Sequence, residues 1–111
     1  MLPNKLSGQA LRHLRALGHD LDPVIAVGKN GVTDVLAKEA GHALDRHELI
    51  KVRVMQEAPV DRHQAAAELA EKTGAVLAQV LGRTFLLYRR SAKKPKIVLP
   101  KSKPAPSGPS Q

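Results

Sequence analysis

The key segment of this chain reads Val24-Ile25-Ala26-Val27-Gly28-Lys29-Asn30-Gly31-Val32-Thr33. Its apolar start predicts a strand, and the pair of glycines that follows is typical of a tight turn. Thr33 is placed to cap a helix, because its side-chain oxygen can accept a backbone N–H of the first helical turn. We therefore predict a strand, a loop and a helix in that order. A strand as uniformly apolar as Val24 to Val27 is expected to be buried on both faces.

The loop between that strand and helix has the pattern Gly28-Lys29-Asn30-Gly31. Glycine reaches positive φ and lacks a Cβ, so the loop can turn sharply and let another molecule approach. Lys29 puts a cation at the tip, and the N-terminus of the following helix favours an anion such as phosphate. KH domains hold a nucleic-acid backbone on a G-x-x-G loop. A bare tetrapeptide of this kind more often marks a turn without a ligand, so the rest of the chain must support the functional interpretation.

Apolar periodicity places the other elements around this segment. We expect helices over about residues 7–17, 33–46 and 61–73, and strands over about 24–27, 49–55, 75–81 and 84–90. Ser7 and Asp61 are placed as N-caps, and Gly18 and Gly74 as C-terminal stops. Gly82-Arg83 suits a two-residue hairpin turn. The order α-β-α-β-α-β-β contains two βαβ units and predicts an α/β sheet. If both crossovers step in the same direction, their helices cover one face and leave the other to the first helix, solvent or a ligand.

Two groups of basic side chains are candidates for a binding surface. Lys51 and Arg53 lie on the polar side of an alternating strand, opposite its apolar residues. Arg12 and Arg15 lie opposite the apolar stripe of the first helix. Such a helix face is more often simply solvated, so it contributes to binding only if it lies near Lys29 in space.

Composition and charge restrict the class of protein. A chain of 111 residues is most simply one domain, and its lack of cysteine excludes disulfides and thiolate metal sites. No apolar run reaches the length of a membrane span and the N-terminus does not resemble a signal peptide, so we expect a cytoplasmic protein without a membrane partner. The net charge of +8 and the pI near 10.2 favour a polyanionic partner.

The positive charge is concentrated near the C-terminus. Residues 1–88 contain 11 basic and 10 acidic residues, whereas residues 89–111 contain 7 basic residues and no acid. Five of the 8 prolines lie from Pro95 onward. Residues 96–100 are predicted to lie along the domain as an extended arm, and residues 101–111 to form a disordered basic tail. Such a tail either binds polyanions loosely or serves as a solvated end.

Catalytic and metal-binding motifs are missing from the sequence. It contains no Walker motif, no G-x-S-x-G elbow and no paired carboxylates in an evident pocket, so we expect neither an enzyme, nor a cofactor, nor a small-molecule substrate. In His47-Glu48-Leu49-Ile50-Lys51, Lys51 stands where a zinc-protease motif needs a second histidine. We favour a local role in which His47 and Glu48 end the helix and orient the strand through local hydrogen bonds. Phe85 and Tyr88 are expected in the core, so base-specific readout is not predicted.

Several blocks together resemble the CRM domain, most closely its small stand-alone bacterial YhbY-type members. The blocks are residues 23–33, His47-Glu48-Leu49-Ile50-Lys51-Val52, Leu81-Gly82-Arg83-Thr84 and Leu87-Tyr88-Arg89. The resemblance implies a fold like the C-terminal domain of translation initiation factor three, with a mixed four-stranded sheet in the order 1-2-4-3. It also implies RNA binding and association with precursors of the large ribosomal subunit; plant relatives act in intron splicing. The family's glycine loop matches Gly28, Lys29, Asn30 and Gly31, and its basic surface is carried over only to Arg12, Arg15, Lys51 and Arg53 as candidates.

The sequence thus predicts a CRM-type RNA-binding domain over residues 1–100, followed by the basic tail. We expect a monomeric, non-catalytic ribosome assembly factor that binds ribosomal RNA through the loop and the adjoining basic surface. The main alternative is a protein-interaction adaptor that docks on a ribosomal protein. Binding to DNA is a further alternative.

Overall fold

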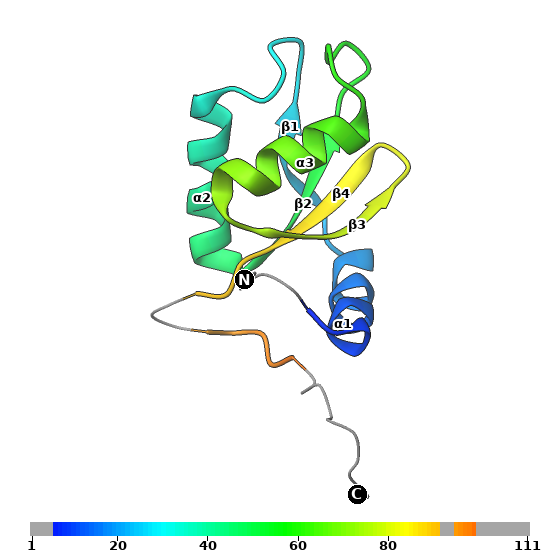
Figure 1. Ribbon diagram of the computed structural model, residues 1–111, viewed down its shortest axis with the longest axis vertical. Coiled ribbons are helices and arrows are strands. Elements are labelled where there is room, and N and C mark those ends of the chain that lie inside the picture. Colours follow the sequence, from blue (N-terminus) through cyan, green and yellow to red (C-terminus); the bar gives the residue numbers. More distant parts are fainter. Residues whose placement is uncertain (1–5, 92–94, 100–111) are drawn as a thin grey trace, which may run out of the picture.

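The computed structural model describes residues 6–91 and 95–99. The elements are α1 (Gly8–His19), β1 (Pro23–Val27), α2 (Asp34–His47), β2 (Leu49–Val54), α3 (Arg62–Thr73), β3 (Val76–Leu81) and β4 (Thr84–Tyr88). Their order is the predicted one (Figure 1). None of the helices in the described part of the chain is long and apolar enough to cross a membrane. The predicted tail over residues 101–111 lies outside the described residues.

The strands form one mixed sheet in the order β1-β2-β4-β3. β1 pairs with β2 in parallel, whereas β4 pairs antiparallel with both β2 and β3. Helices α2 and α3 cover one face of the sheet, and α1 packs against the other (Figure 1). The predicted α/β class and strand order are therefore confirmed, and both crossover helices do lie on the same face.

Each face of the sheet has its own apolar core. The larger core joins the sheet to α2 and α3 and includes Leu44, Ile50, Val52, Leu69 and Phe85. The smaller core lies under α1 and consists of Leu14, Leu49, Ala78, Leu86 and Tyr88. The predicted placement of Phe85 and Tyr88 in the core is confirmed, so neither aromatic ring is free to stack on a base.

The predicted caps fix the helix ends. Ser7 Oγ accepts the N–H of Ala10 at 3.1 Å, Thr33 Oγ1 accepts that of Leu36 at 3.0 Å, and Asp61 Oδ1 accepts that of Gln64 at 2.8 Å. Each N-cap contributes about 1 kcal/mol. At the other end of α3, Gly74 adopts the left-handed conformation at φ 71°. Gly82, at φ 60°, begins the predicted hairpin turn.

The prediction that β1 is buried on both faces is wrong. β1 is an edge strand that pairs only with β2, and the side chain of Val24 is 51% exposed. α1 packs against β2, β3 and β4, which leaves the outer face of β1 uncovered. An apolar run does not distinguish a central strand from an edge strand whose apolar side chains line an open surface.

Gly18 does not stop α1, which continues to His19. An added Cβ at Gly18 would clash with the side chain of Leu86, which is only 2% exposed. The glycine therefore lets α1 approach β4 closely, a packing role that sequence periodicity cannot reveal.

Gly18→Ala should lower the free energy of unfolding by about 1–3 kcal/mol, because the buried Leu86 side chain must move to a strained position. Gly8→Ala is the matched control in the same helix, since nothing lies within 4 Å of a Cβ at that position. Alanine favours a helix over glycine, so this control should be neutral or stabilising by up to about 1 kcal/mol. Urea unfolding of both variants measures the difference, and equal effects would contradict the close-approach role.

The backbone of Glu48 has the predicted local role at the helix end: α2 ends at His47, and the Glu48 N–H donates to Leu44 O at 2.8 Å. The Glu48 side chain has a further role that was not predicted, and the residue is 0% exposed. Its carboxylate accepts the N–H groups of Ser91 at 2.6 Å, Lys96 at 2.7 Å and Ile97 at 2.7 Å. These donors lie more than 40 residues away in sequence, so no local pattern could indicate them.

Residues 95–99, which we call the C-terminal segment, lie along the domain as predicted for the arm. Ile97 and Leu99 pack against the smaller core. The segment has no regular secondary structure, and the Glu48 carboxylate provides the hydrogen bonds that a strand partner would otherwise supply. Residue 100, the last of the predicted arm, lies outside the described residues.

Candidate nucleic-acid interface

Residues 28–31, the glycine loop, connect β1 to α2 at one end of the sheet (Figure 1). The N–H of Gly31 donates to Gly28 O at 3.0 Å, which closes a tight turn. Gly31 adopts φ 72°, whereas Gly28 does not have a positive φ, so only the second glycine supports the conformational argument made from sequence. Lys29 and Asn30 are exposed at the tip and accessible to a ligand.

The glycine loop rests on the connection between β2 and α3. A Cβ at Gly31 would lie 3.3 Å from Pro59 Cγ, and the N–H of Met55 donates to Val27 O at 2.9 Å. The two connections leave the sheet at the same end (Figure 1). The base of the loop is therefore held by packing against the β2–α3 connection, although its tip faces solvent.

All four predicted basic residues lie on the sheet face that carries α1, and three of them adjoin one another. Arg53 is exposed and pairs in register with Ala26, two residues before Gly28. Lys51 is half-buried on the same face of β2, and Arg15 of α1 lines one hollow together with Lys51, Gln79 and Thr84. The strand register places Arg53 near the glycine loop, and Lys51 follows on the same face of β2. The shared hollow brings Arg15 close to Lys51. We call Lys29, Arg53, Lys51 and Arg15 the basic track.

The fourth basic residue, Arg12, is separated from the loop. It is exposed on α1, which lies at the opposite end of the domain from the glycine loop (Figure 1), and unlike Arg15 it does not line the hollow that contains Lys51. In the described part of the chain no hydrogen bond or ion pair joins Arg12 to the basic track. The structure therefore supports Arg12 less than the other candidates.

The cations of the basic track are not neutralised by nearby acids. Among the described residues, ion pairs form between Lys72 and Asp34 at 3.2 Å and between Arg89 and Asp45 at 2.8 Å. Neither pair includes a residue of the track, so its charges are available to an anion. Asp34, in the first turn of α2, is the one acid close to the glycine loop in sequence, and Lys72 offsets its charge.

Sequence reasoning missed Arg62 and Arg83. Arg62 opens α3 and Arg83 is the second residue of the hairpin turn, and both line a hollow beside Pro59, the residue on which the glycine loop rests. The connections that follow parallel strands lie at the same edge of a sheet. The predicted topology could therefore have indicated that Arg62 and Arg83 lie near the glycine loop.

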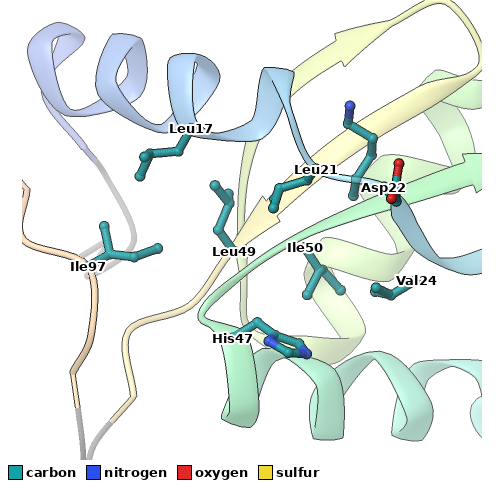
Figure 2. Close-up of a pocket in the computed structure, with 9 residues that line it drawn as sticks. Leu17, Leu21, Asp22, Val24, His47, Leu49, Ile50 and Ile97 are labelled. Carbon is teal, nitrogen blue, oxygen red and sulfur yellow. The ribbon is translucent and has the colours of Figure 1, made fainter.

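An apolar pocket of about 420 Å³ lies at the uncovered face of β1. Figure 2 shows Leu17 of α1, Leu21, Val24 of β1, Leu49 and Ile97 directed toward one space. His47 and Lys51 are among its polar lining residues. Leu17 and Val24 have apolar spacing typical of core residues, but they are exposed because they line this open pocket. No group of acidic or histidine side chains in the described part of the chain could hold a metal ion.

The chain resembles known proteins over most of its length. The CRS1/YhbY (CRM) domain matches residues 6–89. A Bacillus subtilis protein named "Probable RNA-binding protein YqeI" is 39% identical over 95 residues, which cover 86% of this chain and 99% of that protein. A Haemophilus influenzae protein named "RNA-binding protein" is 35% identical over 96 residues, covering 86% and 96%. The solution structure of SAV1595 from Staphylococcus aureus, described as a candidate RNA-binding protein, has a TM-score of 0.74 and 38% identity, covering 86% of this chain and 100% of that chain.

Proposed function

Because this chain belongs to the CRS1/YhbY (CRM) domain family, we propose that it is a non-catalytic RNA-binding protein that assists ribosome assembly. The relatives named above as RNA-binding proteins support the choice of RNA. The observation that carries the proposal is the glycine loop with its exposed Lys29 and Asn30, joined to the basic track through the register of Ala26 with Arg53. The preferred RNA is precursor RNA of the large ribosomal subunit, bound by a monomer in the cytoplasm.

The glycine loop binds a phosphate of the RNA in this proposal. Backbone N–H groups of Lys29 and Asn30 donate to the phosphate oxygens, and the Lys29 ammonium adds a charge-assisted hydrogen bond, worth about 1.5–3 kcal/mol. Arg53, Lys51 and Arg15 bind phosphates further along the strand. These contacts hold the backbone and require no nucleophile or acid–base pair, so the proposal assigns no reaction to the protein.

Lys29→Ala should weaken binding to structured RNA for all sequences and lower the slope of log K against log salt by about one. Fluorescence anisotropy between about 50 and 200 mM salt measures both quantities. Lys38→Ala is the matched control, because Lys38 is an exposed lysine on α2 and its removal changes the net charge equally. Equal behaviour of the two variants would argue against a role for the glycine loop.

The apolar pocket favours a second candidate function, an adaptor that docks on a ribosomal protein through exposed Leu17 and Val24. Apolar contacts survive nuclease treatment and about 0.5 M salt, whereas phosphate-dominated binding is lost under those conditions. Recovery of a ribosomal protein after both treatments would therefore support the adaptor. Equal affinity for duplex DNA and structured RNA would instead indicate DNA binding.

A further inference from the structure

A hollow of about 410 Å³ lies between the β2–α3 connection and the β3–β4 hairpin. Its walls include Met55 and Pro59 of the β2–α3 connection, Asp61 and Arg62 at the start of α3, and Arg83 of the hairpin turn. A volume of this order lies within the range of small-molecule sites, about 300–1,000 Å³. The walls combine apolar side chains with two arginines and one acid, which is a suitable lining for a flat, polar-edged ring.

The hollow adjoins the glycine loop. Pro59 belongs to its wall and is also the residue that a Cβ at Gly31 would touch at 3.3 Å. Met55, another wall residue, donates its N–H to Val27 O at 2.9 Å, immediately before the loop. An RNA strand with a phosphate on the loop therefore has a neighbouring nucleotide within reach of the hollow.

The backbones of the two arginines are held in place by the sheet and by α3. The N–H of Val54 donates to Arg83 O at 2.7 Å, which ties the hairpin turn to β2, and Arg62 is the first residue of α3. Neither forms an ion pair with another described residue. A guanidinium plane stacks on a base, and its donors match O6 and N7 of guanine.

Asp61 makes the hollow better suited to a base than to a phosphate. Its Oδ1 atom caps α3 by accepting the Gln64 N–H at 2.8 Å. That hydrogen bond is the main cause that lowers the pKa of the carboxyl group, so Asp61 stays ionised and repels phosphate. A carboxylate accepts N–H groups, and guanine presents the N2 amino donor that adenine lacks.

We propose that this hollow, the base pocket, binds an unpaired guanine next to the phosphate held by the glycine loop. Asp61 accepts a hydrogen bond from the guanine amino group. The Arg62 and Arg83 guanidinium groups stack on the base or donate to its O6 and N7 atoms. The inference rests on the proposed function and adds base preference to it. It differs from the expectation drawn from the sequence, where scarce aromatics argued against base-specific readout. Arginine supplies the planar surface that aromatic residues provide in other RNA-binding modules.

The test uses the full chain and an RNA hairpin whose single-stranded loop holds one guanine among uridines, with adenine, cytosine or uridine substituted at that position. The wild type should bind the guanine RNA about 5- to 150-fold more tightly than the other three, which is the discrimination that one good base contact provides. Asp61→Ser keeps an N-capping side chain, and Arg83 lies on an exposed turn, so Asp61→Ser and Arg83→Ala should both fold. Both should remove most of the guanine preference.

Lys29→Ala separates this inference from the proposed function, because it should weaken all four RNAs equally and keep the preference. Four equal affinities that still depend on Lys29 would overturn the base pocket and leave the proposed function standing. A guanine preference unchanged in both pocket variants, with melting curves like the wild type, would also overturn the pocket. RNA binding that is independent of Lys29 and of the pocket would reject both proposals.

Discussion

Glu48→Ala should lower the free energy of unfolding by about 3–5 kcal/mol. The carboxylate is 0% exposed and accepts three backbone N–H groups at 2.6 to 2.7 Å. Removing the acceptor takes one hydrogen bond to a charged group from each of these part-buried N–H groups, at about 1.5–3 kcal/mol for each bond. The C-terminal segment then loses its attachment, and Ile97 and Leu99 lose their packing against the smaller core.

Two variants separate the carboxylate from other effects. Glu39→Ala removes an exposed acid from α2 and should change stability by less than about 0.5 kcal/mol. Glu48→Gln keeps the shape and one acceptor oxygen, so its loss should be smaller than that of alanine. Denaturant unfolding gives the energies, and hydrogen exchange at residues 95–99 reports whether the segment is released. Unchanged exchange in Glu48→Ala would show that other contacts hold the segment.

The pH dependence of stability provides a separate readout of Glu48. Burial alone would raise its pKa, but hydrogen bonds from Ser91, Ile97 and Lys96, together with the charge of Arg90, outweigh burial and lower it. A carboxyl group whose pKa is lower in the folded state stabilises the fold above its unfolded value of about 4.3, and this contribution is lost as pH falls through the folded value. Wild-type stability should therefore fall in acid more steeply than that of Glu48→Gln. Asp61 titrates in the same direction in both proteins and cancels in the comparison.

The sequence was sufficient for the features that depend on neighbours along the chain. Caps at Ser7, Thr33 and Asp61, the left-handed Gly74 and the hairpin at Gly82 are local, so residue type and spacing predict them. Strand alternation likewise placed Lys51 and Arg53 on the side opposite the larger core. The strand order needed the family resemblance, because local patterns do not state which strands pair.

Features that depend on distant packing were mispredicted for physical reasons. Val24 is exposed because β1 is an edge strand. Gly18 does not end the helix; its lack of a Cβ lets α1 lie close to Leu86. Glu48 binds backbone groups that lie more than 40 residues away in sequence. In the candidate site, the register of Ala26 with Arg53 places Arg53 close to the glycine loop, and both were candidates from the sequence. Arg62 and Arg83 became candidates only from the fold, because the β2–α3 connection and the hairpin share a hollow.

Replacing Lys29, Lys51 and Arg53 together with alanine should weaken RNA binding by at least about 100-fold at low salt. Each side chain is free of ion pairs within the described residues, so each can release counterions from the RNA, and the salt slope should fall by about two when three contacts to single-stranded RNA are lost. Anisotropy titrations at several salt concentrations measure both changes. Melting curves check the fold, since Lys51 is half-buried.

The control for this variant replaces three exposed cations outside the basic track with alanine: Lys38 and Arg46 on α2, which covers the opposite face, and Arg90, which follows β4. Both triple variants lower the formal net charge from +8 by the same amount, so they differ only in where the charge is lost. Binding through the basic track requires a much larger loss in the first variant, because phosphate contacts are short-ranged once salt screens the remaining charges. Equal losses would mean that the overall charge attracts RNA without a defined surface, and the strand register that joins Arg53 to the glycine loop would then have no bearing on affinity.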